Sequence, residues 1–125
     1  MPDPRATLLP RPARMAGIAL RTAHLGAMAL LVGGTWYGVP DAALRGGLVA
    51  VVLSGAGLVV SEASHSRHWV YQGRGLLVLA HLAAGGLAGA LGPGALLAAL
   101  VIGAVGSHLP KNLRAWSLRH GAVVE

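Results

Sequence analysis

The stretch MAGIALRTAHLGAMALLVGG, residues 15–34, decides the fold class of this chain. It is almost wholly apolar, and a membrane-spanning helix needs about 20 such residues. A basic segment precedes it, so a signal peptide is an alternative, but its length favours a retained helix. Arg21 and His24 lie inside it. Because charged and ionisable groups are costly in hydrocarbon, each of these residues is a functional-site hypothesis.

The composition of the whole chain is typical of a membrane protein. Of its 125 residues, 54% are hydrophobic and only 11% are charged, whereas soluble domains have about 25% charged residues. The chain has no cysteine, which excludes disulfides, thiolate metal sites and covalent CxxCH attachment of haem. Any cofactor must therefore be held by histidine, methionine or oxygen ligands.

Four apolar runs predict an all-α fold, an integral membrane antiparallel four-helix bundle. They cover about residues 16–37, 44–61, 75–91 and 95–109, close to the roughly 17–25 residues that a span requires. Short turns between the first two runs and between the last two make those neighbours antiparallel. The predicted organisation is a disordered basic tail at 1–14, the bundle at 15–110 and a cytoplasmic interfacial tail at 111–125.

The basic residues predict the orientation of the bundle. An even number of spans places both termini on one side, and all ten lysines and arginines except Arg45 would lie there. By the positive-inside rule that side is cytoplasmic. The prediction is a multi-pass protein of the cell inner (plasma) membrane with cytoplasmic N and C termini. Since the basic residues border apolar runs and form no patch, the lipid bilayer is the expected partner and nucleic acid is not.

Two histidines on different predicted helices lie at matched depth. His24 would be about 12 Å and His81 about 9 Å from the inner ends of their helices, at 1.5 Å per residue. Two such imidazoles are what a buried metal ion, or a haem iron with two axial ligands, requires. The simpler interpretation is that each histidine only donates a hydrogen bond to a neighbouring helix.

The residues beside His24 form a face that runs from polar to apolar. Arg21 lies one turn before His24 and Met28 one turn after it. A haem propionate near the inner interface would form charge-assisted hydrogen bonds with Arg21. An ion pair between Arg21 and Glu62 is the competing interpretation.

Small residues accompany His81 on the third predicted helix. His81, Gly85 and Gly89 follow one another at i, i+4 and i+8, which predicts a smooth stripe with room for a haem plane. Close helix packing explains a glycine stripe equally well.

A second group of histidines, His65, His68 and His108, is expected at the inner interface. These residues could be alternative iron ligands, part of a quinone pocket or a copper site, although interfacial histidines often have no ligand. The segment Lys111 to Arg119 predicts a short helix along the inner leaflet, with partner docking as the alternative. No special role is expected for His120.

The layout resembles small b-type cytochrome subunits of membrane redox complexes, over about residues 14–109 and without a specific sequence motif. The resemblance implies non-covalent haem b, with His24 and His81 as axial ligands and Arg21 as a propionate partner. It also implies electron exchange with quinone and with other membrane or peripheral redox subunits, or within a homo-oligomer. Because no histidine lies in the outer half of any predicted helix, the chain matches a pattern with one haem near the cytoplasmic side.

Two alternatives to a cytochrome stay open. The chain has no P-loop, GxSxG or HExxH motif, so an electron-transfer subunit is a better prediction than a stand-alone enzyme. A copper-type transport or metal-binding protein would use Met28 with the histidines. A structural subunit without a cofactor would have the same apolar, small-residue-rich composition.

Overall fold

The computed structural model describes residues 12–65 and 68–123 and is almost entirely helical. Its elements in chain order are α1 (Pro12–Trp36), α2 (Asp41–His65), the 3-10 turn η1 (Trp69–Tyr71), α3 (Gly73–Gly86), α4 (Ala88–Leu91), α5 (Pro93–His108), α6 (Lys111–Ala115), β1 (Trp116–Ser117) and β2 (Ala122–Val123). The predicted all-α fold class is confirmed, with one small pair of strands added at the C-terminal end.

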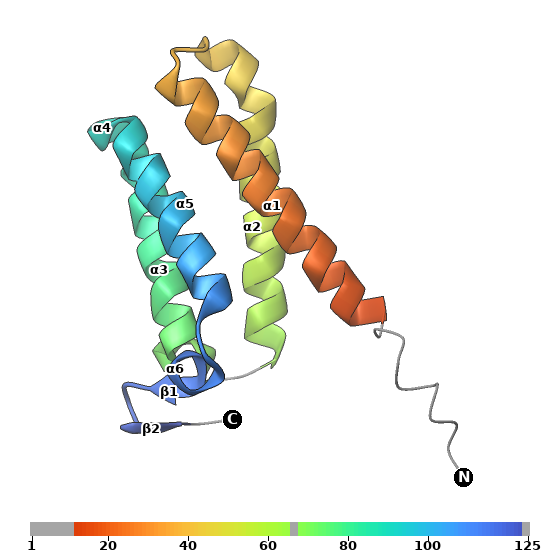
Figure 1. The fold of residues 1–125 in the computed structure, drawn as a ribbon, viewed down its shortest axis with the longest axis vertical. Coiled ribbons are helices and arrows are strands. Elements are labelled where there is room, and N and C mark those ends of the chain that lie inside the picture. Colours follow the sequence, from red (N-terminus) through yellow and green to blue (C-terminus); the bar gives the residue numbers. More distant parts are fainter. Residues whose placement is uncertain (1–11, 66–67, 124–125) are drawn as a thin grey trace.

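The main helices are arranged as two hairpins (Figure 1). α1 and α2 form the longer hairpin, and α3 with α4 and α5 forms the shorter one. Gly38 and Gly92 make the two tight turns with φ angles of 71° and 79°, a conformation that favours glycine because it has no Cβ. α1 packs against both α2 and α5, and α3 packs against α5. The two hairpins therefore meet mainly through α1 and α5.

Two of the described helices are long and apolar enough to cross a membrane. These segments, Arg14–Trp36 and Asp41–Ser64, have mean hydropathies of 1.5 and 1.9. A core helix of a soluble protein or a signal sequence near the N-terminus also meets this criterion. The helix α5 is apolar but has only 16 residues, and α3 has 14. The structure thus supports two candidate spans, and the four-span bundle and its orientation stay predictions.

Each main helix begins two to four residues earlier than predicted, and α2 (Asp41–His65) also ends four residues after the predicted run 44–61. α1 begins at Pro12, inside the segment 1–14 that was expected to be a tail, because proline in the first turn needs no N–H partner. Residues 1–11 of that tail lie outside the described residues. The run 75–91 is divided at Leu87 between α3 and α4, after the weak helix formers Gly85 and Gly86. The predicted continuous stripe from His81 to Gly89 is therefore interrupted.

A small cap closes the end of the α3–α5 hairpin (Figure 1). We define it as residues 69–72 together with residues 111–123. Gln72 and Ser117 have no exposed surface and form a β-bridge, and the Leu118 N–H donates to the Tyr71 carbonyl at 2.9 Å. The predicted helix over 111–119 thus ends at Ala115, because the chain then turns to pair β1 with β2.

Candidate functional site

The structure brings His24 of α1 and His81 of α3 into contact. Their ring centroids are 5.7 Å apart, with the ring planes inclined by 59°. His24 is 8% exposed, and His81 is half-buried. These residues are 57 positions apart in the chain (81 − 24), so the meeting of the two hairpins alone places them together.

Hydrogen bonds define which nitrogen of each ring carries a proton. His81 Nδ1 lies 2.7 Å from the Ala99 carbonyl oxygen, which can only accept, so Nδ1 donates. His24 Nδ1 lies 2.9 Å from the Ser54 hydroxyl, whose own proton is donated to the Ala50 carbonyl one turn earlier. With its proton on that carbonyl, Ser54 Oγ has a lone pair that can accept from His24 Nδ1. In the neutral form of each ring, Nε2 is then the atom that keeps a lone pair.

Two glycines pack directly against the imidazoles. A Cβ at Gly55 of α2 would lie 3.0 Å from His24 Cε1, and a Cβ at Gly103 of α5 would lie 3.2 Å from His81 Nδ1. Both distances are tighter than normal packing allows. None of Ser54, Gly55 and Gly103 was predicted from the sequence as a site residue. A serine followed by glycine in the middle of an apolar run was the available signal for the first two.

An apolar wall follows His24 along α1. Met28 is 2% exposed, and Leu31 and Val32 are also buried. They fall at i+4, i+7 and i+8 from His24, which is one face of a helix. The sequence-predicted neighbour Met28 is thus placed one turn from His24, in the best-buried part of α1.

Gly85, the predicted haem-face residue of α3, has open space beside it. A Cβ at this position would meet no other group within 4 Å, apart from its own helix. It lies one turn beyond His81 on the same helix. The side of α3 next to His81 is therefore not filled by protein at this point.

Arg21 is joined to Glu62 by an ion pair, the interpretation that competed with a propionate contact. Arg21 Nη2 lies 2.7 Å from Glu62 Oε1, and Arg74 Nη1 lies 3.3 Å from Glu62 Oε2. Arg74 Nε also donates to the buried Gln72 side chain at 2.7 Å. This network connects α1, α2 and α3, and it reaches the cap through Gln72.

Replacing Glu62 by glutamine should weaken this connection. The carboxylate serves two arginines, but the Arg21 side chain is 51% exposed, so screening by water limits the effect to about 1 kcal/mol of unfolding free energy. Unfolding in mixed micelles at low and high salt measures it, and the difference from wild type should shrink as salt rises. Arg45→Gln, on the same helix, is the control. A salt-independent loss would mean that E62Q acts through packing instead.

The described part of the second histidine group, His68 and His108, belongs to no candidate metal site. Among the described residues, no set of three or more histidine and acidic side chains could hold a metal ion. His108 is exposed at the end of α5, and the His65 side chain lies outside the described residues. The ring centroid of His68 lies 5.5 Å from that of His120, edge to face. His120, for which no role was expected, is thus the histidine next to His68.

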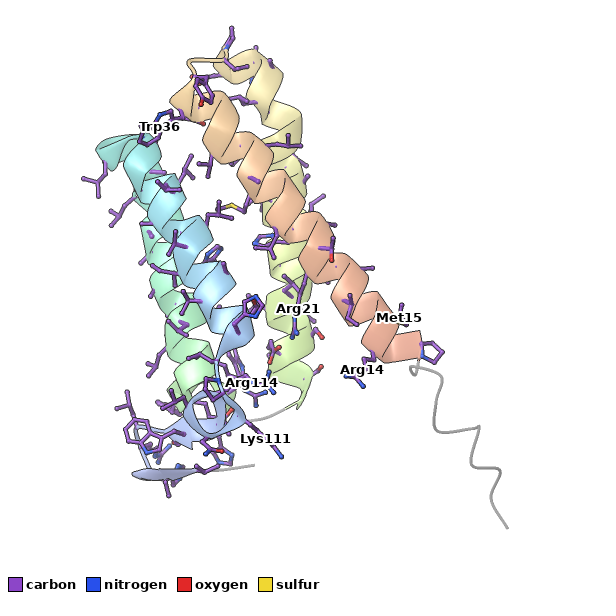
Figure 2. The ribbon with its side chains drawn as sticks, viewed as in Figure 1. Arg14, Met15, Arg21, Trp36, Lys111 and Arg114 are labelled. Atoms are coloured by element: carbon purple, nitrogen blue, oxygen red, sulfur yellow. The ribbon has the colours of Figure 1, made fainter. Side chains whose placement is uncertain are left out.

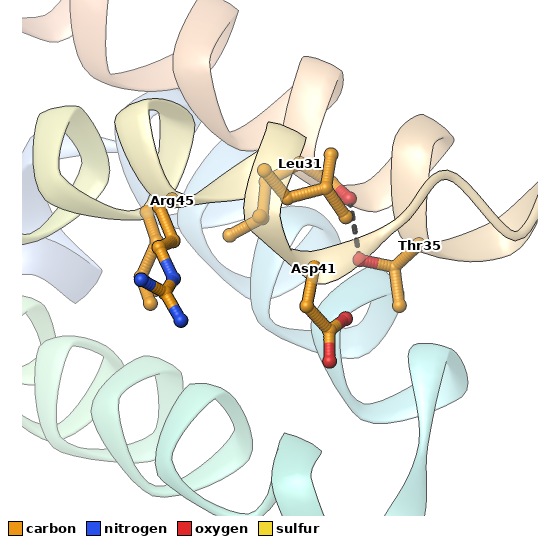
Figure 3. A pocket seen from close by; sticks show the side chains of 6 residues that line it. Leu31, Thr35, Asp41 and Arg45 are labelled. Atoms are coloured by element: carbon orange, nitrogen blue, oxygen red, sulfur yellow. Dashed lines mark hydrogen bonds between the residues drawn. The ribbon is translucent and has the colours of Figure 1, made fainter.

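A separate pocket lies between α1 and α2, near the turn that joins them (Figure 3). Its volume is about 300 Å³. The Thr35 hydroxyl on its wall donates to the Leu31 carbonyl. The residues that line it are Leu31, Thr35, Asp41, Leu44, Arg45 and Leu48. None of these is a histidine, and Leu31 is shared with the apolar wall that follows His24.

The histidine pair, its two hydrogen-bond acceptors and the two glycines form one site between the hairpins. The glycines let α2 and α5 approach the rings, and the acceptors orient them. The lone pairs of the two imidazole Nε2 atoms can act as metal ligands, so such a site can bind a transition metal ion or a haem iron. No protein-family model matches this chain, and neither a curated protein nor a solved structure is significantly similar to it.

Proposed function

We propose that this chain is a membrane-embedded electron-transfer protein that binds one haem b through Nε2 of His24 and Nε2 of His81. The observation that carries the proposal is that both Nδ1 atoms already donate hydrogen bonds, to Ser54 and to the Ala99 carbonyl. Metal-ligating histidines almost always use their second ring nitrogen in this way, which orients the ring and raises its basicity. Both rings are thus prepared as ligands.

The spacing of the rings supports the same proposal. Metal–imidazole bonds are about 2.0–2.1 Å long, so two rings that would share one ion must lie close together. The observed separation is 5.7 Å. The open space beside Gly85 favours a planar group on that side of His81. Arg21 remains the proposed propionate partner, through guanidinium N–H groups other than the Nη2 contact to Glu62.

His24 and His81 would hold the haem, which would supply one-electron transfer chemistry. The protein side chains would orient the haem, bury it and exclude water from it. His24 lies at the centre of α1, and we propose short-range exchange with another redox subunit, a second copy of the chain or a quinone.

The membrane placement is part of the proposal. We propose that α1, α2, α3 with α4, and α5 all cross the bilayer, with both termini in the cytoplasm. None of the residues in the apolar stretch of α2 is buried within the protein, as expected for a helix that faces lipid. α5 would span only about 24 Å, which a bilayer accommodates by local thinning.

An absorption spectrum of the detergent-purified protein, oxidised and then reduced with dithionite, tests the haem assignment. Sharp α and β bands in the reduced spectrum and a pyridine haemochrome of haem b are expected. The protein must be expressed with an adequate haem supply. A featureless spectrum from a well-folded sample would overturn the proposal.

The second candidate function is binding of a bare copper-type ion by the same pair. The contact between the two rings favours it, because one ion can join two neighbouring imidazoles without a porphyrin. Met28, one turn from His24, would then be the closest soft ligand. Metal analysis of the haem-free sample separates this function from a structural subunit, which would contain neither haem nor metal.

Gly103→Val should impair the site without removing a ligand. The added side chain would press on His81 Nδ1 and break its bond to the Ala99 carbonyl. Losing the hydrogen bond that orients a metal-ligating histidine lowers metal affinity by about 10–100-fold. The affinity for haem, measured by titration with haemin, should fall by about that factor. Gly106→Val, one turn further along α5, faces only the flexible Leu77 side chain and is the matched control. Equal losses in both variants would indicate general misfolding.

A further inference from the structure

We propose that the C-terminal cap binds the headgroups of anionic phospholipids through Arg114 and Arg119. The proposal rests on the membrane placement given above but not on the haem. Its starting observation is that the cap carries cations and exposed apolar side chains together.

The cap is a fixed platform on α3. Gln72 and Ser117 are fully buried within it, and α6 packs against α3. The α3 residue Gly73 leaves space for the Leu113 carbonyl, against which any Cβ would clash. Side chains on the outside of the cap are therefore held at a constant height relative to the ends of α3 and α5.

The charge of this platform has one sign. No aspartate or glutamate occurs between Glu62 and Glu125. Among the described residues, Glu62 forms its ion pairs with Arg21 and Arg74, and no carboxylate pairs with Arg114 or Arg119. The Arg119 guanidinium instead lies 5.6 Å from the centroid of the Tyr71 ring. Both guanidiniums thus keep N–H groups for phosphate oxygens.

Exposed apolar side chains accompany these cations. Leu113 is 58% exposed and Leu118 is 57% exposed, with Trp116, Tyr71 and Val123 also open. A lipid surface satisfies both kinds of group, because the apolar side chains enter the headgroup boundary while the guanidiniums meet phosphate. An acidic protein would match the charge alone.

The cap is also continuous with the surface that lipid would cover. Figure 2 shows Lys111 and Arg114 at the same end of the molecule as Arg14, opposite Trp36. α3 and α5, which lead into the cap, expose a series of apolar side chains: Leu76, Leu79, Leu82, Leu97, Val101 and Val105. Lipid tails on these helices would place their headgroups at the level of the cap.

Quenching of tryptophan fluorescence by brominated lipids tests the proposal. The reporter is the full chain with Trp36→Phe, which leaves Trp69 and Trp116 in the cap. It is placed in phosphatidylcholine bilayers that contain one fixed fraction of either brominated phosphatidylglycerol or brominated phosphatidylcholine. An arginine next to the membrane raises the affinity for an anionic lipid by about five-fold. The anionic lipid should therefore quench more, with a local enrichment of about five-fold that decreases at high salt.

Variants separate the possible results. Adding Arg114→Gln and Arg119→Gln should abolish the enrichment, whereas Arg45→Gln at the opposite end should preserve it. Inorganic phosphate at the same concentration should not compete, since the site requires a lipid. Equal quenching by the two lipids would overturn the proposal and favour an acidic protein partner. Absence of quenching by either lipid would overturn the membrane placement, while the haem spectrum is measured independently.

Discussion

Replacing His81 by alanine is expected to abolish the low-spin haem spectrum. The variant removes one of two proposed iron ligands, together with the bond from Nδ1 to the Ala99 carbonyl. Losing only the hydrogen-bond partner of a metal ligand lowers metal affinity by about 10–100-fold. Losing the ligand itself should therefore weaken haem binding by more than about 100-fold. Haem content by pyridine haemochrome and titration with haemin measure the effect, and His24→Ala should behave in the same way.

Two controls show whether this loss is specific. His108→Ala removes an exposed histidine at the end of α5 and should leave the spectrum unchanged. Imidazole added to H81A should enter the vacated space and restore six-coordinate bands, which a misfolded protein could not do. If H81A retains a full complement of low-spin haem, the assignment of His81 is wrong.

Replacing Gly75 by alanine is expected to detach the cap. Gly75 is buried in the first turns of α3, where a Cβ would clash with the Trp69 carbonyl and lie 2.8 Å from Val70 Cα. These are backbone atoms, so relief requires η1 to move and the fully buried Gln72 to lose its position. Overpacking of this kind costs about 1–3 kcal/mol, measurable as unfolding free energy in mixed micelles.

The matched control is Gly86→Ala on the same helix. Gly86 is the last residue of α3, a Cβ there meets nothing within 4 Å, and alanine forms helix better than glycine. This variant should be as stable as wild type or slightly more stable. Limited proteolysis should cleave the chain near α6 faster in G75A alone. Equal stability of G75A and wild type would show that the cap is not held against η1 in the way described.

Much of the fold could be predicted from local sequence. The helical class follows from long apolar runs, and the hairpin turns follow from glycine and proline at residues 38–41 and 92–94. A similar level for His24 and His81 was predicted from their distances to the inner ends of their helices. These features depend on spacing along a single helix, which sequence reports directly.

Other features could not be predicted from sequence. The division of the 75–91 run at Leu87 and the β1–β2 pair after α6 depend on contacts between distant segments, such as Gln72 with Ser117. The neighbours of the imidazoles were missed for the same reason. Gly55 and Gly103 are two among 19 glycines, and only helix packing distinguishes the two that touch a histidine ring.

The sequence by itself determined the apolar helices and their turns, because hydrophobicity, chain length and turn chemistry act locally. Only the tertiary structure decided that Arg21 pairs with Glu62, that Ser54 and the Ala99 carbonyl accept from the rings, and that His68 lies beside His120. Those outcomes depend on how the two hairpins and the cap are rotated against one another, and helix rotation is set by packing between segments far apart in the chain.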